Sequence, residues 1–366
     1  MGKKKTFDSI TFFAVVGLVI GGFLIFMSAS LGLLARDGAQ FSNIAASQFL
    51  LGVVGGFSAL YITSHIPYRF WRHYALYVFL GAVAATLLVF VPGIGLEFNG
   101  ARRWLNLGIT TLQPAELLKI GYVLYLAVWL SRRRSKKIPF IARTLPFVLI
   151  TSVVALLLLM QPDTGTFLVI ALTGGVMYFV SGAQLKDLAV LALIGVIGLS
   201  GLIFSRDYAL DRVKTFISPA SDPQGAGYQI QQSLNAVGSG QLFGRGFGQS
   251  IQKFTHLPEP TSDSIFAVFA EEFGFVGAVV LIIAFAVVAL RSLSIAARAP
   301  DMFSGLVAVG IAILIAVQSF LNIGSMLGVF QLTGLPLIFI SHGGTALFMS
   351  LASVGILLNI SRFMRV

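Results

Sequence analysis

The chain has 366 residues, of which 57% are hydrophobic and 11% are charged, and its mean hydropathy is +0.90. Soluble globular domains carry about 25% charged residues, so this composition excludes a soluble protein and predicts an integral membrane protein. The net charge of +11 is divided among short loops beside apolar segments, which favours lipid headgroups over nucleic acid as the partner, and the lack of cysteine excludes disulfides and cysteine-bound metals.

Ten apolar segments follow one another along the chain, most of them long enough to cross an about 30 Å hydrocarbon core as a helix. We place them at residues 10–34, 46–64, 74–92, 112–130, 144–160, 166–181, 187–205, 264–290, 302–324 and 334–360. Lys and Arg concentrate in the loops on one side, and cytoplasmic loops carry such an excess. Residues 1–366 are therefore predicted to form one transmembrane domain with both termini in the cytoplasm. The acids gather outside, where we expect the chemistry.

The loop at residues 93–111 is the first outer loop with unusual charge. It carries the adjacent arginines Arg102 and Arg103, after a turn predicted at Asn99 and Gly100. Guanidinium groups match pairs of phosphate oxygens. The two arginines therefore predict an anion-binding site.

Polar residues also mark the start of two later spans. The fourth span opens with Gln113 and carries Glu116 and Lys119. Glu116 and Lys119 lie three residues apart on one helix face, so they predict an ion pair within the membrane. Asp163 precedes the sixth span, where it either caps that helix or belongs to the site.

The longest segment outside the spans covers residues 206–263, between the seventh and eighth spans, and is predicted to be extracellular. A loop of this length is usually functional. It carries Arg212, Arg245 and Lys253, and cations on the outer side run against the usual distribution of charge. Together with the earlier arginines and Lys119, they favour a phosphate-bearing ligand over simple surface charge.

Acidic residues gather where this loop meets the eighth span. Asp263 precedes the apolar run, so it either caps the helix or presents a carboxylate that could accept a proton or hold a divalent cation, and the two roles are compatible. Glu271 and Glu272 lie two turns deeper, where at most one of them shares a face with the helix start. They either pair with a cation, such as Lys119 or an outer arginine, or take part in the chemistry.

The last apolar segment contains residues that interrupt helices. Pro336 and the pair Gly343-Gly344 lie within it, beside Ser341 and His342. Freed backbone groups are tolerated in lipid only against protein or a water-filled cavity. This segment is therefore predicted to line an interior site. The four histidines of the chain show no metal-ligand spacing, so no zinc site is predicted.

Several motifs, in this order, resemble the SEDS family of cell-wall proteins, which includes FtsW, RodA and SpoVE. The resemblance spans the chain and rests on these sequences: Asn99-Gly100-Ala101-Arg102-Arg103-Trp104, Gln113-Pro114-Ala115-Glu116-x-x-Lys119, Gln161-Pro162-Asp163-x-Gly165-Thr166, Gly227-Tyr228-Gln229, Leu257-Pro258-Glu259, Asp263-x-Ile265-Phe266-Ala267, Glu271-Glu272-x-Gly274 and Thr333-Gly334-x-Pro336. Residues 222–229 and 248–253 resemble FtsW more than RodA.

The resemblance implies an all-α membrane domain and a peptidoglycan glycosyltransferase that polymerises lipid II on the outer face of the bacterial cytoplasmic membrane during cell division. Asp263 takes the position of the family's essential carboxylate and would act as the general base, while polyprenyl pyrophosphate leaves. The implied partners are lipid II, the nascent glycan strand, a class B penicillin-binding transpeptidase and other division proteins. A lipid II flippase and a RodA-like elongation polymerase are the alternatives.

The pyrophosphate charge would be stabilised by outer cations and by a divalent cation, Mg²⁺ or Mn²⁺, for which Asp263 is the candidate ligand. The predicted ligand-binding cations are Arg102, Arg103, Lys119, Arg212, Arg245 and Lys253. The predicted supporting residues are Gln113, Glu116, Asp163, Glu271, Glu272, Ser341 and His342. The chain departs from the FtsW-like pattern at Ser264, where an aromatic residue is usual, and at His342, where tyrosine is usual.

Overall fold

The computed structural model describes residues 7–36, 38–98, 101–106, 108, 111–132, 140–205, 207–218, 222 and 225–364. Two features named above lie outside these residues: the turn at Asn99 and Gly100, and residues 223 and 224 of the motif at 222–229. The statements about structure that follow concern the described residues.

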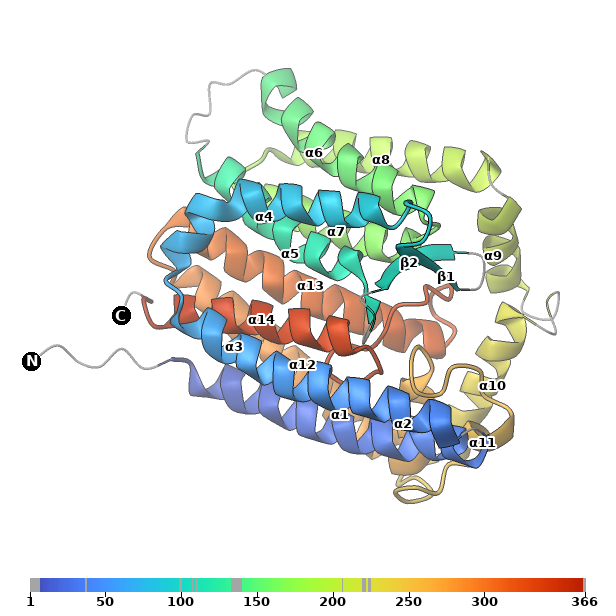
Figure 1. The fold of residues 1–366 in the computed structure, drawn as a ribbon. Helices are drawn as coiled ribbons and strands as arrows, with labels where there is room; N and C mark the ends of the chain where they lie inside the picture. Colours follow the sequence, from blue (N-terminus) through green and yellow to red (C-terminus); the bar gives the residue numbers. More distant parts are fainter. Residues whose placement is uncertain are drawn as a thin grey trace, which may run out of the picture.

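Long helices lie side by side and form a bundle (Figure 1). In chain order they are α1 (Ser9–Arg36), one continuous run made of α2 (Gly38–Ser47), the π-helix η1 (Gln48–Gly55) and α3 (Gly56–His65), then α4 (Tyr68–Leu88), α5 (Pro114–Ser131), α6 (Phe140–Met160), α7 (Thr164–Val180), α8 (Leu185–Ser205), α12 (Ile265–Ala297), α13 (Met302–Met326) and α14 (Gly344–Ser361). Three shorter helices are α9 (Asp207–Ile217), α10 (Ala226–Ser239) and α11 (Gln252–Thr255).

Six segments are long and apolar enough to cross a membrane by length and composition. They are Ser9–Gly32, Ile44–His65, Pro114–Ser131, Ile265–Ala297, Met302–Met326 and Gly344–Ser361, and two shorter apolar helices cover Thr144–Met160 and Thr164–Val180. The predicted polytopic membrane bundle is therefore confirmed at this level. Both α13 and α5 are enclosed on most sides, as expected for helices that are apolar around their whole circumference.

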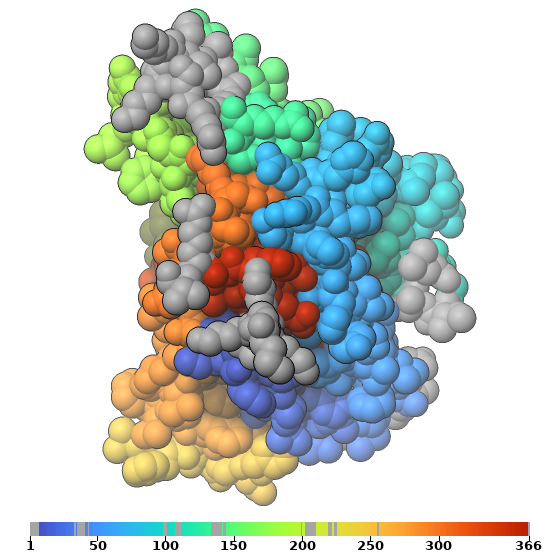
Figure 2. Space-filling view, turned by 90° about the vertical axis from the view of Figure 1, so that its left-hand side faces the viewer, coloured from blue at the N-terminus to red at the C-terminus, as the bar shows by residue number. Residues whose placement is uncertain are grey.

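The bundle has two different ends. The helix α1 begins and α14 ends at one of them, the terminal end, on the left of Figure 1. Figure 2 shows this end, where red α14 lies between the blue helices of the first quarter of the chain and orange α12 and α13. The opposite end carries α9, α10 and α11, and we call it the site end.

A small sheet at the site end adds to the predicted helical bundle a feature that the sequence did not indicate. It contains β1 (Gly95–Phe98), β2 (Ala101–Asn106) and β3 (Thr111–Leu112), which pair antiparallel in that order. Hydropathy gives no signal for strands as short as these. The arginines Arg102 and Arg103 therefore lie on a strand, where neighbouring side chains point to opposite faces.

A second correction concerns the last apolar segment, predicted to be helical from residue 334. Helix α14 begins only at Gly344, and residues 327–343 run from α13 to α14 as turns and extended chain. We call them the 327–343 segment. Gly334 at φ 67° and Pro336 lie within it, and both disfavour helix. Most of its side chains are buried, which explains why hydropathy alone cannot separate it from a membrane helix.

Candidate functional site

Asp263 lies at the site end, in the loop of residues 256–264 between α11 and α12. The N-cap residue of α12 is Ser264, and no side chain caps that helix. The capping role considered for Asp263 is therefore wrong, and its carboxylate does not serve the helix. That carboxylate accepts a hydrogen bond from Ser262 Oγ (3.1 Å).

The main chain around Asp263 is held by side chains from α13 and the 327–343 segment. Asn322 on α13 donates through Nδ2 to the carbonyl of Asp263 (2.8 Å) and to the carbonyl of Leu335 (2.7 Å). Ser341 Oγ donates to the carbonyl of Ser262 (2.7 Å). These bonds join the Asp263 loop to the 327–343 segment, so the reactive side chain stands on a fixed backbone.

Burial changes the acidity of Asp263. The carboxyl group is partly enclosed, and its desolvation raises the pKa to about 6, against an opposing effect of the Ser262 hydrogen bond. The negative charge of Glu259 raises the pKa further, whereas the guanidinium groups of Arg212 and Arg103 lower it. The group is thus mostly ionised at neutral pH, yet it accepts a proton more readily than an ordinary aspartate with a pKa of about 3.9.

Gly334 forms part of the surroundings of the carboxylate. A Cβ atom at this position would lie 3.5 Å from Asp263 Oδ2, and the φ of 67° is one that side chains rarely adopt. The glycine is exposed, so one side of Asp263 stays open.

Of the predicted cations, Arg103 and Arg212 are the ones whose charge acts on Asp263. Arg103 extends from β2 and donates to the carbonyls of Gln161 (3.0 Å) and Pro162 (2.5 Å). Arg212 extends from α9 and donates to the carbonyl of Leu332 (3.0 Å). Two elements far apart in the sequence, β2 and α9, therefore bring positive charge to one acid.

Arg102 is placed differently from its neighbour on β2. It is exposed and pairs with Glu97 on β1 (2.9 Å), where both side chains are about half exposed. Such exposed pairs contribute about 0–1 kcal/mol. Arg102 can therefore exchange Glu97 for another anion at the rim of the site.

The ion pair predicted on α5 is confirmed. Lys119 Nζ lies 2.8 Å from Glu116 Oε2, and both side chains are buried. Lys119 also donates to Gln318 Oε1 (2.6 Å), and Gln318 Nε2 donates to the carbonyl of Pro336 (3.0 Å). The ion pair is thus connected to the 327–343 segment through Gln318. Gln113, the residue before α5, is half-buried and makes no capping bond with its side chain.

Asp163 caps α7, one of the two roles left open for it. Its Oδ1 accepts from the N–H of Thr166 (3.2 Å), and the side chain is buried. Gly165, the second residue of α7, lies against the 327–343 segment, because a Cβ there would approach the carbonyl of Thr333 to 2.8 Å. Asp163 therefore fixes the helix end on which that segment rests.

Ser341 and His342 have distinct positions in the same segment. The hydroxyl of Ser341 accepts from the N–H of Leu337 (2.7 Å) while it donates to the Asp263 loop. The ring of His342 stacks on Phe26 of α1 (5.9 Å between centroids). Burial lowers the pKa of His342 to about 4, so the imidazole is neutral at physiological pH. His342 therefore contributes packing against Phe26 and no charge.

The structure does not bring Lys253 to Asp263, which corrects its predicted role in phosphate binding. Its ammonium group is fully enclosed and donates to Glu272 Oε1 (2.7 Å), Ser28 Oγ (2.9 Å) and the carbonyl of Gly248 (2.8 Å). An ammonium group has three protons. All three are used within the protein, so none is left for a phosphate.

Glu271, like Glu272, is buried and forms hydrogen bonds and an ion pair within the protein. Its carboxylate accepts from Ser250 Oγ (2.5 Å) and from the N–H groups of Ile251 (3.1 Å) and Gln252 (3.3 Å). It also pairs with Arg245 at 3.4 Å, as one interpretation of the sequence predicted. We call Glu271, Glu272, Lys253 and Arg245 the clasp. It holds a loop to α12 and takes no visible part in the Asp263 site.

Metal binding at Asp263 is limited by the ligands available. Among the described residues, no group of three or more His, Asp or Glu side chains could hold a metal ion. Mg²⁺ is commonly bound by one or two carboxylates together with substrate phosphates and water. The Asp263 carboxylate therefore fits a divalent cation that is completed by a phosphate-bearing ligand.

Asn322 and Gln318 are the residues that sequence reasoning missed. They lie four positions apart on α13, hence on one face of an otherwise apolar helix. Two amide side chains with that spacing in a membrane span are costly unless they have partners. That cost was the signal that could have identified them.

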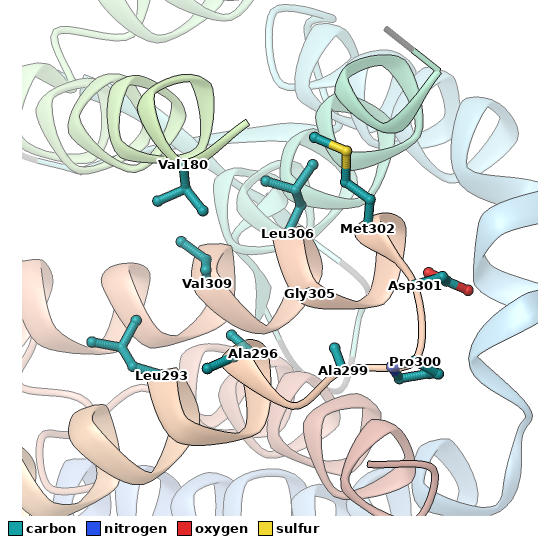
Figure 3. Close-up of a pocket in the computed structure, with 11 residues that line it drawn as sticks. Val180, Leu293, Ala296, Ala299, Pro300, Asp301, Met302, Gly305, Leu306 and Val309 are labelled. Carbon is teal, nitrogen blue, oxygen red and sulfur yellow. The ribbon is translucent and has the colours of Figure 1, made fainter. Parts of the chain in front are cut away.

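A separate cavity of about 580 Å³ lies at the terminal end, beside the connection between α12 and α13 (Figure 3). Apolar side chains such as Val180, Leu293 and Val309 line it. Its acid, Asp301, is already engaged in the capping box of α13 with Ser304. The cavity therefore offers no reactive group.

The bundle of apolar helices defines a multi-pass membrane protein. At one end it carries a candidate acid–base site, Asp263, whose carboxylate is influenced by the charges of Arg103 and Arg212. The chain belongs to the family of FtsW, RodA and SpoVE: the family model described as "Cell cycle protein" matches residues 9–366. The protein is accordingly a multi-pass protein of the bacterial cytoplasmic membrane.

Two relatives cover the full length of the chain. Stage V sporulation protein E of Bacillus subtilis is 37% identical over 365 residues, which make up 100% of both chains. A "Probable peptidoglycan glycosyltransferase FtsW" of a Geobacter species is 36% identical over 368 residues, 100% of this chain and 99% of that one.

Solved structures share the fold. A chain of a peptidoglycan synthase complex, described for its coordination of polymerization and crosslinking, matches with a TM-score of 0.81 at 28% identity over 97% of this chain and 98% of that one. The rod shape determining protein RodA of Thermus thermophilus matches with a TM-score of 0.70 at 28% identity over 97% of each chain.

Proposed function

We propose that this protein is a peptidoglycan glycosyltransferase that polymerises lipid II on the outer face of the cytoplasmic membrane. The observation that carries the proposal is Asp263: a carboxylate with a pKa near 6, on a backbone fixed by Asn322, and without a capping role. The names of the FtsW relatives support the same activity.

In the proposed reaction, Asp263 accepts the proton of the acceptor sugar hydroxyl. The hydroxyl oxygen then attacks the anomeric carbon of the donor, and the bond from that carbon to polyprenyl pyrophosphate breaks. A positioned general base contributes roughly 10²–10⁴ in rate. The carboxylate must therefore be ionised at the start of each turn, which its pKa of about 6 allows at neutral pH.

The pyrophosphate would be bound by Arg103 and Arg212, with Arg102 at the rim. Charge-assisted bonds from guanidinium groups are strong where water is partly excluded. A divalent cation held by Asp263 and the phosphates would neutralise further charge on the leaving group. In this proposal Lys119 does not contact the ligand. It positions the 327–343 segment through its hydrogen bond to Gln318, which in turn bonds to Pro336.

We further propose ten spans with both termini in the cytoplasm. The terminal end, where α1 begins and α14 ends, would face inward, which fits an even number of spans. The site end would then lie outside, where the lipid-linked sugar is polymerised. Basic loops on the inner side support this orientation.

Within the family we propose a role in cell division or sporulation rather than elongation, since the full-length relatives named FtsW and SpoVE are 36% and 37% identical, against 28% for the solved RodA. A class B penicillin-binding transpeptidase is the proposed partner. The similar chain from a complex that couples polymerization with crosslinking supports it.

The decisive experiment is polymerisation by the purified protein with its transpeptidase, lipid II and Mg²⁺ or Mn²⁺. Asp263→Asn keeps the size of the side chain and removes the base, so glycan synthesis should fall roughly 10²–10⁴-fold. Glu259→Gln is the matched control, an exposed acid in the same loop whose variant should keep wild-type turnover at neutral pH. Equal activity in Asp263→Asn and the wild type would remove Asp263 from catalysis.

The same variants separate a polymerase from a flippase. Movement of fluorescent lipid II across vesicles needs no general base, so Asp263→Asn should leave any such movement unchanged. If the variant lost lipid movement and the wild type made no glycan, the flippase would be the better assignment.

A further inference from the structure

Helix α12 contains a break that a membrane helix cannot leave unsupported. Gly274 adopts φ 66° and ψ −166°, although the residues on both sides are helical. Such a break frees backbone N–H and C=O groups from the helix ladder. In hydrocarbon, each freed group must find a partner within the protein, because lipid offers none.

The loop of residues 241–251, which follows α10, supplies partners on one side of the break. The N–H of Phe275 donates to the carbonyl of Gln241 (2.8 Å). The N–H of Val276 donates to the carbonyl of Leu242 (3.1 Å). The two donors that follow the break are therefore bonded to the loop.

The same loop serves the carbonyls that precede the break. Arg245 N–H donates to the carbonyl of Glu271 (3.0 Å), and Gly246 N–H donates to that of Glu272 (2.9 Å). This approach needs glycine, since a Cβ on Gly244 would lie 2.1 Å from the carbonyl oxygen of Glu272. The loop and the helix break are thus joined backbone to backbone.

The charges beneath the loop are paired as well. Glu272 is matched by Lys253, and Glu271 by Arg245 together with hydroxyl and main-chain donors. Unpaired charges near hydrocarbon are unfavourable. The clasp removes that cost, so the loop can lie against lipid.

Four large apolar side chains of the loop are exposed. Phe243 is 80% exposed, Leu242 60%, and Phe247 and Ile251 54% each. Exposing large apolar side chains to water is unfavourable, so a patch of four indicates an apolar environment. The patch continues onto the exposed side chain of Phe275, directly after the break in α12.

The depth of the patch follows from the length of α12. The helix rises roughly 26 Å between Gly274 and Arg291, at 1.5 Å for each residue, close to the about 30 Å of a hydrocarbon core. Arg291 is charged, partly exposed and paired with Asp8 at the terminal end. Gly274 and the attached loop therefore lie at the opposite boundary of the hydrocarbon.

We propose that the 241–251 loop is a lipid anchor, which inserts Leu242, Phe243, Phe247 and Ile251 among the acyl chains of the leaflet at the site end. The clasp and the backbone bonds to α12 make the insertion compatible with hydrocarbon. The anchor holds the start of α12, and with it the Asp263 loop, at a fixed height above the membrane.

The lack of native cysteine makes the proposal directly testable. A nitroxide label is attached at Phe243→Cys or Phe247→Cys in the full chain, in vesicles of phosphatidylethanolamine and phosphatidylglycerol. The matched control is Lys214→Cys on α9, an exposed position at the same end. Melting in detergent checks that each labelled protein is folded, and both loop positions are exposed, so the labels disturb no core.

We expect labels at 243 and 247 to collide more often with O₂, which concentrates in lipid, than with a water-soluble nickel chelate, and the label at 214 to show the reverse. Equal behaviour of 243 and 214 in the protein alone would overturn the anchor. Shielding at 243 that arises only when the transpeptidase is added would also overturn it, and would identify the patch as a protein-binding surface instead.

Discussion

Two acidic positions at the start of α12 show opposite kinds of environment. Asp263 is partly enclosed, accepts a hydrogen bond from Ser262, and keeps one side open beside Gly334. Glu272, nine residues on, is fully buried, and its Oε1 accepts from Lys253 and Ser28. Burial alone therefore does not mark a reactive acid, because Glu272 has its counter-charge, Lys253, inside the protein, whereas Asp263 stays open to a ligand.

The cations divide in the same way. Arg103 and Arg212 donate to carbonyl oxygens, and the positive charge of each lowers the pKa of Asp263. Lys253 is instead buried in an ion pair with Glu272. The charge of the two arginines therefore acts at the Asp263 site, whereas that of Lys253 is neutralised away from it.

Breaking the clasp should produce the largest loss of stability. Lys253→Met leaves the Glu272 carboxylate buried without its counter-charge, which costs about 3–5 kcal/mol. We expect a much lower melting temperature in detergent, measured by thermal unfolding. The double variant Lys253→Met/Glu272→Gln should recover part of this loss. A single variant as stable as the wild type would contradict the contrast between the two acids.

Removing the amide of Asn322 should affect the site more than the fold. Asn322→Ala deletes two hydrogen bonds worth about 0.5–1.5 kcal/mol each, so we expect a moderate loss of stability. Because Asn322 positions the main chain of Asp263, kcat should fall while KM changes little, and the acid limb of the pH–rate profile should shift.

The matched control for Asn322 is Ser325→Ala, one turn along α13, whose hydroxyl bonds only to the local carbonyl of Asn322. This variant should keep both the wild-type kcat and the wild-type pH profile. If the two variants lost kcat equally without a change in the pH profile, Asn322 would have a structural role only.

The pH dependence tests the environment of Asp263 directly. Its pKa is raised to about 6, and catalysis needs the ionised form, so activity should be full above that pH and be lost as the pH falls through about 6. Glu259→Gln removes a charge that raises this pKa, and should move the acid limb to lower pH. Arg212→Gln should move it to higher pH. Initial rates of glycan synthesis between pH 4 and 8 (roughly the window of carboxylate and imidazole titration) measure both shifts.

The smallest effect is expected at the exposed edge of the clasp. Arg245 is 39% exposed, and its guanidinium lies 3.4 Å from Glu271. Partly exposed pairs contribute about 0.2–1 kcal/mol, so Arg245→Gln should lower the melting temperature only slightly. A loss as large as that of Lys253→Met would show that the two halves of the clasp are equivalent, contrary to the burial that separates them.

Much of the helical fold follows from the sequence, because hydrocarbon selects for long apolar helices. The predicted spans at 10–34, 112–130 and 302–324 correspond to α1, α5 and α13 within a few residues. The ion pair of Glu116 and Lys119 was also predictable, since its geometry depends on a single helix. Contacts of this kind need only the regular spacing of one element.

Features that depend on contacts between distant segments were not predictable. Lys253 and Arg212 both lie between α8 and α12 in the sequence, and only the packing of α1 and α12 around Lys253 separates their roles. Likewise, the 327–343 segment has the apolar composition of a membrane helix because the surrounding bundle buries it. Hydropathy reports burial, and it does not report the backbone conformation of what is buried.

Gly334 bears on what kind of acceptor the site admits. Its exposed backbone leaves lateral room beside Asp263 Oδ2, and a hydroxyl carried on a sugar ring needs such room, whereas a water molecule does not. A larger residue at 334 would screen the carboxylate from the ring while water could still enter. The absence of a side chain at Gly334 would then favour transfer of the glycan to another sugar over its hydrolysis.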